Sequence, residues 1–121
     1  MTYASFIEGL RLRHFSAREL TSYAERVRGN VQNSLPPEPL WQNIVPTLWV
    51  LDCLRESLKR PIKIVSAYRN ERYNGSLPNA AKNSQHLRNA ALDFQVTGTL
   101  PATAFDRLQR MRDAGVFRGG L

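Results

Sequence analysis

His86 and Asp93 are the residues of this sequence whose types and spacing best suit chemistry. His86 is one of only two histidines, and it stands seven residues before Asp93 in the run SQHLRNAALD. An imidazole nitrogen and a carboxylate oxygen both bind Zn²⁺ at about 2.0–2.2 Å, and a catalytic zinc usually takes three protein ligands and a water. The pair therefore predicts two ligands of a zinc site, with a third to be supplied from elsewhere.

A folded domain has to position these ligands, and the composition predicts one. The chain has 121 residues, of which 42% are hydrophobic and 22% charged, as in folded soluble domains. Its single cysteine, Cys53, excludes an internal disulfide and a cysteine-rich zinc module. Any metal site in this chain therefore has to use His, Asp or Glu side chains.

The first predicted helix begins at a capping pattern. Ser16 and Glu19 have the S-x-x-E form, in which hydroxyl and carboxylate satisfy the free amides of a helix start. We expect a helix over about 17–28, closed by Gly29 and Asn30.

The second predicted helix covers about 39–58 and carries the longest apolar face of the chain. Trp41 and Trp49 broaden this face, and Pro46 should bend or split the helix because it removes an amide. The other expected elements are a strand at 61–69, a loop with a helical turn at 70–83, a strand at 90–96, a helix at 103–114 and the start of a third strand at 116–117.

Four segments of the chain carry a resemblance to a known family. They are IVSAYR at 64–69, YN at 73–74, AKNSQH at 81–86, and Ala91 with Asp93. In order and spacing they match an S-x-Y-R strand end followed by S-x-H-x-x-G-x-A-x-D. The chain thus resembles the M15 zinc peptidases, which comprise D-alanyl-D-alanine carboxypeptidases and peptidoglycan endopeptidases and include many phage lysis enzymes.

This resemblance implies a fold and a set of roles. The fold would be a single α+β domain over 1–121, Hedgehog/DD-peptidase-like, with a small antiparallel sheet packed against helices. His86 and Asp93 would be zinc ligands, and the Arg69 guanidinium would be the catalytic group that holds a peptide carboxylate or the oxyanion. Ser84 and Gln85 would orient the histidine through hydrogen bonds. The implied activity is hydrolysis of amide bonds in peptidoglycan stem peptides by zinc-activated water.

The sequence departs from the family pattern at two places. Asn89 stands where the family has glycine, which is tolerable because asparagine readily adopts positive φ. After a Gly-Gly pair like Gly119-Gly120, family members continue into a strand with a third ligand histidine and a nearby catalytic carboxylate. We therefore expect that no residue of this chain supplies the third metal ligand or the general base. We also expect the fold to be truncated at its C-terminus.

Other residues do not replace the missing ligand convincingly. His14 is the only other histidine and precedes the first predicted helix. The remaining carboxylates are explained equally well as solvated charges on helices or loops: Asp52, Glu56, Glu71, Asp106 and Asp113. With only two ligands, zinc is expected to be bound weakly or lost. Without a general base as well, the chain is expected to be inactive or impaired as a peptidase.

Two further classes of function remain as alternatives. One is a non-catalytic module of the same fold that binds peptidoglycan or forms part of a phage particle. The other is a basic nucleic-acid-binding protein, suggested by the net charge of +7 but disfavoured because no nucleic-acid-binding motif accompanies it. An exposed sheet edge would also permit self-association.

The sequence also bears on location. It has no signal-peptide pattern and no stretch of about 18 apolar residues, so membrane insertion is not expected. We expect a cytoplasmic or phage-associated protein that reaches the cell wall after release.

Overall fold

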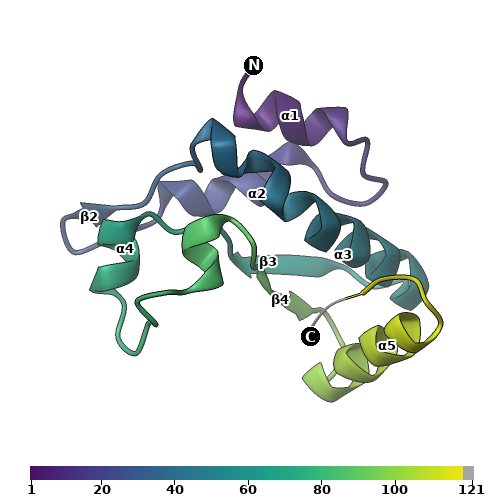
Figure 1. Cartoon of the computed structure of the whole chain (residues 1–121). Coiled ribbons are helices and arrows are strands. Elements are labelled where there is room, and N and C mark those ends of the chain that lie inside the picture. Colours follow the sequence, from purple (N-terminus) through teal and green to yellow (C-terminus); the bar gives the residue numbers. More distant parts are fainter. Residues whose placement is uncertain (119–121) are drawn as a thin grey trace.

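The computed structural model describes residues 1–118 and combines helices with two short antiparallel sheets, which confirms the predicted α+β class. The elements, with η for a 3₁₀ helix, are α1 (Tyr3–Gly9), α2 (Ala17–Thr21), η1 (Ser22–Glu25), β1 (Val27–Arg28), β2 (Val31–Gln32), η2 (Glu38–Ile44), α3 (Val45–Leu58), β3 (Ile62–Ser66), α4 (Glu71–Ser76), η3 (Gln85–Arg88), β4 (Asp93–Val96) and α5 (Pro101–Asp113). In Figure 1, α3 runs along the β3–β4 sheet, α5 lies near one end of it, and α4 lies beside β2 at the other.

Helix α3 is the centre of the hydrophobic core. Its apolar face buries Leu48, Leu51 and Leu54, which share one core cluster with Ile62 of β3 and Met111 of α5. Full burial of one such side chain contributes about 1.5–3 kcal/mol. This core fixes the sheet against α3 and thereby positions the strand ends that carry the candidate site.

Pro46 divides the long apolar helix in two, as the sequence predicts. The 3₁₀ helix η2 ends at Ile44, and α3 begins at Val45 with Pro46 in its first turn. Proline is tolerated there because the first amides of a helix have no intrahelical partner.

The two tryptophans beside this face have different environments. Trp41 is buried, and its indole N–H donates to the carbonyl of Pro36 at 2.9 Å. Trp49, which the sequence places on the packed stripe, is instead 55% exposed. It lines an apolar groove between α3, Phe94 of β4 and Leu108 of α5, so the prediction for Trp49 is wrong.

The helix predicted over 17–28 is wrong in its length. Its capping box forms, because the Ser16 hydroxyl accepts from the Glu19 amide and the Glu19 carboxylate accepts from the Ser16 amide. However, α2 ends at Thr21, and after η1 the chain enters an antiparallel hairpin of β1 and β2. Gly29 has a φ of +62° in the hairpin turn rather than at a helix end. The Gly29-Asn30 pair, with a valine two residues before it and another directly after it, is a hairpin signal that competes with the helix pattern.

The β3–β4 sheet brings the two sequence motifs together. The strands are antiparallel, so the end of β3 at Ser66 lies opposite the start of β4 at Asp93. Both strands are shorter than the segments predicted at 61–69 and 90–96. Within residues 1–118 no third strand joins this sheet, and the strand start predicted at 116–117 is wrong. Gly119 to Leu121, after which the resemblance expects the missing strand, lie outside the described residues.

Two carboxylates of α3 hold the segment before α2. Asp52 accepts hydrogen bonds from the backbone amides of Arg13 and His14, each at 2.9 Å. The Glu56 carboxylate contacts the His14 ring and also accepts from Lys59 at 2.8 Å. The only other histidine of the chain is therefore engaged on α3. No helix among residues 1–118 is long and apolar enough to cross a membrane.

Glu56 makes a testable contribution to acid stability. The Lys59 hydrogen bond, followed by that of His14, lowers the pKa of Glu56 from 4.5 to about 2. A carboxyl whose pKa is lower in the folded state stabilises the fold above its unfolded pKa, and this stabilisation disappears as the pH falls through the folded pKa. In Glu56→Gln we therefore expect a lower urea midpoint than in the wild type at neutral pH, and a difference that vanishes between pH about 4.5 and about 2. Glu8→Gln, which removes an exposed carboxylate of α1, is the control and should leave the urea midpoint at neutral pH at the wild-type value. A Glu56→Gln difference that persists at the acid end would contradict this account.

Candidate metal centre

The ring of His86 is held in a defined orientation by the end of β3. Its Nδ1 lies 2.7 Å from the carbonyl oxygen of Ala67. A carbonyl only accepts, so Nδ1 carries the proton and donates it, which leaves Nε2 of the neutral ring free to bind a metal. The Arg69 amide also donates to the His86 carbonyl at 3.1 Å, and the His86 side chain is only 10% exposed.

Asp93 lies next to this free nitrogen. Its Oδ2 is 3.3 Å from Nε2 of His86 and accepts a hydrogen bond from the Ser66 hydroxyl at 2.5 Å. Asp93 begins β4, and its side chain is 58% exposed. The two predicted ligands thus meet where a largely buried imidazole faces a carboxylate that solvent can reach.

Arg69, which lies three residues after the end of β3, completes the cluster. Its Nη2 lies 3.7 Å from Asp93 Oδ2 and 3.5 Å from the Ser66 hydroxyl, while Nη1 lies 3.3 Å from the side-chain oxygen of Asn74. These contacts are at the long end for hydrogen bonds. The buried Nε makes no hydrogen bond within residues 1–118. Nη1 and Nη2 carry two protons each and each donates one of these long hydrogen bonds, so the guanidinium keeps donor capacity at these two nitrogens for an additional anionic group.

The distance between the ligand atoms of His86 and Asp93 fits two ligands of one zinc ion. Two atoms bound at about 2.0–2.2 Å to a tetrahedral zinc are about 3.4 Å apart, and the observed separation between Nε2 and Oδ2 is 3.3 Å. One nitrogen and one oxygen are also ordinary zinc donors. These two residues are therefore suited to hold zinc without a rearrangement of their side chains.

The described residues provide no third metal ligand beside these two. Within residues 1–118 no three His, Cys, Asp or Glu side chains come together as a metal site. His14 contacts Glu56, and Asp106 pairs with Arg110 at 3.1 Å on α5.

Ser84 and Gln85, the two residues expected to orient His86, make different contacts. The Ser84 hydroxyl accepts from the His86 amide at 3.2 Å, so it holds the backbone of η3 rather than the ring. Gln85 is exposed at the start of η3, and its carbonyl accepts from the Ala90 amide at 3.0 Å. The ring itself is oriented by the Ala67 carbonyl, a backbone group for which a sequence pattern gives no signal.

Ser66 and Asn74, two side chains of the family motifs, make contacts that the sequence does not predict. Ser66 hydrogen-bonds the Asp93 carboxylate. Asn74 is buried on α4, accepts from Arg69, and donates to the Ala81 carbonyl at 2.9 Å. Asn74 therefore connects the arginine to the loop that leads into η3.

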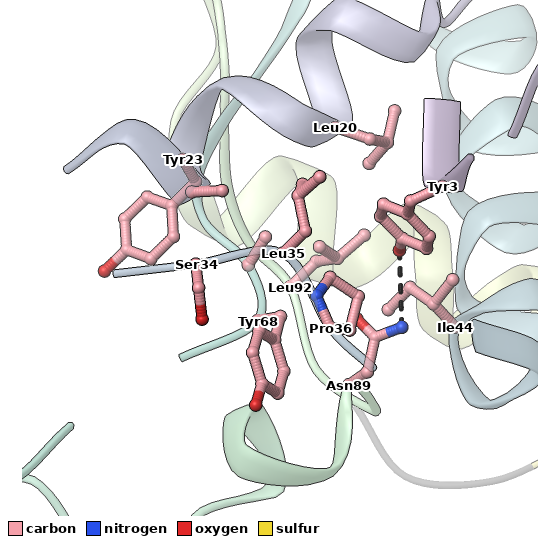
Figure 2. Close-up of a pocket in the computed structure, with 12 residues that line it drawn as sticks. Tyr3, Leu20, Tyr23, Ser34, Leu35, Pro36, Ile44, Tyr68, Asn89 and Leu92 are labelled. Atoms are coloured by element: carbon pink, nitrogen blue, oxygen red, sulfur yellow. Dashed lines mark hydrogen bonds between the residues drawn. The ribbon is translucent and has the colours of Figure 1, made fainter. Parts of the chain in front are cut away.

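Asn89 ends η3 in the left-handed conformation that the sequence predicts for it. Its φ is 58° and its ψ 38°. The buried side-chain amide donates to the Leu40 carbonyl at 3.1 Å and to the Tyr3 hydroxyl at 3.3 Å. Figure 2 shows this amide directed at Tyr3 among the residues that line an internal pocket. Asn89 thereby ties the His86 segment to α1 and η2.

The tyrosines beside the site remain protonated at neutral pH. Burial is the main cause that raises the pKa of Tyr68 and of Tyr73 above its ordinary value. A second cause for Tyr73 is its hydrogen bond with Tyr23, whose ring it meets edge-on at 5.8 Å. Neither hydroxyl is therefore suited to act as a general base.

One of three comparisons with known proteins identifies a family for the chain. No curated protein and no solved structure matches the chain. The family model described as Peptidase M15 matches residues 13–120, which include β3, η3, β4 and all of the candidate centre. The chain therefore belongs to the peptidase M15 family.

Proposed function

We propose that this chain is the scaffold of a zinc peptidase that acts on peptidoglycan stem peptides, with the third metal ligand and the general base supplied from outside residues 1–118. The observation that carries the proposal is the pairing of His86 Nε2 with Asp93 Oδ2 at 3.3 Å, beside the guanidinium of Arg69, whose Nη2 lies 3.7 Å from the same oxygen. Membership in the M15 family supports the peptidase class, and the resemblance of the motifs supports the substrate.

Each residue has a distinct part in this proposal. When bound, zinc supplies a Lewis acid and lowers the pKa of a water molecule. His86 and Asp93 hold the metal, and the Ala67 carbonyl keeps the His86 nitrogen directed at it. Arg69 donates to a substrate carboxylate or to the oxyanion that develops on the amide carbonyl.

The open edge of β4 is where we place the additional ligand. Within residues 1–118, β4 pairs only with β3, so no strand covers its other edge. A strand added at this edge would lie beside the carboxylate of Asp93. Further sequence, a second copy of the chain or a phage virion protein would each be able to provide such a strand.

Zinc measurement on three variants tests the ligand roles. We expect the wild type to bind zinc and His86→Ala to lose it, because a single carboxylate holds zinc weakly. His14→Ala removes the only other histidine, which lies against Glu56, and should retain zinc like the wild type. The measurement is metal content after dialysis against a defined free-zinc buffer. Equal zinc in wild type and His86→Ala would reject the ligand role of His86.

A second candidate function is a non-catalytic peptidoglycan-binding module of the same family. The observation that favours it is the lack of a third metal ligand among residues 1–118. This alternative predicts that the chain sediments with insoluble peptidoglycan equally well with and without a chelator, and releases no new amino groups from it. The peptidase proposal instead predicts zinc-dependent release once a third ligand is supplied.

A further inference from the structure

The β3–β4 pairing contains one irregularity, and it lies beside the candidate centre. The register runs Ile62 to Val96, then Lys63 to Gln95, then Ile64 to Phe94. The next cross-strand pair joins Ser66, not Val65, to Asp93. Val65 is therefore the additional residue of a β-bulge, a feature that re-aims side chains near functional sites.

This bulge determines which side chain faces the Asp93 carboxylate. In a regular ladder Val65 would be opposite Asp93 and would present only methyl groups to it. With the bulge, Ser66 is opposite and its hydroxyl donates to Asp93 Oδ2 at 2.5 Å. The next residue, Ala67, supplies the carbonyl that orients His86. Consecutive residues after the bulge thus hold both candidate ligands.

The Ser66 hydroxyl has a fixed direction. Its single proton goes to Asp93, and its oxygen accepts from Nη2 of Arg69 at 3.5 Å. Ser66 itself is buried, whereas the Asp93 side chain is 58% exposed. Water can satisfy an exposed carboxylate, so Asp93 does not need this serine for solvation. The contact instead restricts the rotation of the carboxylate.

We propose that Ser66, placed by the Val65 bulge, is a positioning residue that holds Asp93 in its metal-binding orientation. This inference rests on the proposed function, because it concerns the same two ligands. Ser66, His86 and Arg69 all approach the same oxygen, Oδ2, so loss of the hydroxyl leaves the carboxylate free to turn away from His86. Groups that orient metal ligands typically contribute about 10–100-fold to metal affinity.

An isosteric pair of variants isolates the hydroxyl. Ser66→Thr keeps the hydroxyl and Ser66→Val replaces it by a methyl group of the same shape. Zinc affinity is measured by competition with a chromophoric chelator, and unfolding of the zinc-free proteins is followed in parallel. We expect Ser66→Thr to bind zinc nearly as the wild type does, and Ser66→Val to bind about 10–100-fold more weakly. Ser76→Ala removes a serine hydroxyl that donates to the Tyr73 carbonyl at 2.6 Å, and should leave zinc affinity unchanged.

The outcomes separate this inference from the function on which it rests. A wild type that binds zinc through His86, together with equal affinities for the threonine and valine variants, would overturn the role of Ser66 alone. A wild type that binds no zinc would overturn both proposals. If Ser66→Val does not fold, Ser66→Ala takes its place with the same expected loss, and an unchanged affinity there also overturns the role.

Discussion

Replacement of Leu54 by alanine is expected to lower the free energy of unfolding by about 2–5 kcal/mol. Leu54 is 0% exposed on the core face of α3, where it belongs to the same cluster as Ile62 and Met111. The truncated side chain would leave a cavity because α3, β3 and α5 are held by many other contacts and relax only in part. Urea unfolding followed by circular dichroism measures the loss.

The matched control is a leucine that lies outside this core. Leu100 precedes α5 and is 74% exposed, so Leu100→Ala should change the free energy of unfolding by no more than about 0.5 kcal/mol. Similar losses in the two variants would mean that the packing around α3 is not the dominant source of stability. Loss in Leu54→Ala alone would confirm that the packing of this face of α3 is a main source of stability.

The sequence predicts the elements whose signals are local and repeated. The apolar stripe of α3 extends over several turns, and Pro46 marks its start by removing an amide. The motif around His86 and Asp93 likewise indicates residues that the fold does place together. In both cases the signal consists of residue types at fixed spacing, which a sequence displays directly.

The features that the sequence does not predict depend on backbone geometry or on distant packing. A capping box at Ser16 predicts where a helix begins but not where it ends, so it gives no sign of the hairpin that follows η1. The bulge at Val65 changes the register by one residue without a residue type that requires it. Exposure of Trp49 depends on which elements cover α3, and no local pattern specifies that.

Asn89 combines a backbone conformation that the sequence predicts with side-chain contacts that it does not predict. Its position in the motif indicates a left-handed residue, which the structure confirms, but its side-chain partners come from α1 and η2. η2 also holds η3 through Asn43, whose amide donates to the Arg88 carbonyl at 2.9 Å. The orientation of η3, and therefore the placement of His86, depends on amide side chains as well as on the S-x-H pattern.

Two substitutions at Asn89 should separate its conformational role from its hydrogen bonds. Asn89→Gly retains the positive φ of 58° but loses both donors and leaves the Leu40 carbonyl without this partner. We expect it to lower the free energy of unfolding by about 1–3 kcal/mol. Asn89→Ala loses the same hydrogen bonds and additionally forces a Cβ-bearing residue without a local hydrogen bond into the left-handed region, which costs about 1–2 kcal/mol more. Thermal or urea unfolding of the three proteins gives both differences.

The order of the three stabilities decides between the two roles. If Asn89→Gly is as stable as the wild type, the bonds to Leu40 and Tyr3 contribute nothing, and if alanine equals glycine the left-handed backbone has no cost. Because Asn89 terminates the 3₁₀ turn that contains His86, a loosened turn also allows the imidazole to move away from Asp93. Zinc affinity should therefore fall in the same order as stability, from wild type through glycine to alanine. Full zinc affinity in a destabilised Asn89→Ala protein would show instead that the Ala67 carbonyl and the Arg69 amide are sufficient to place His86.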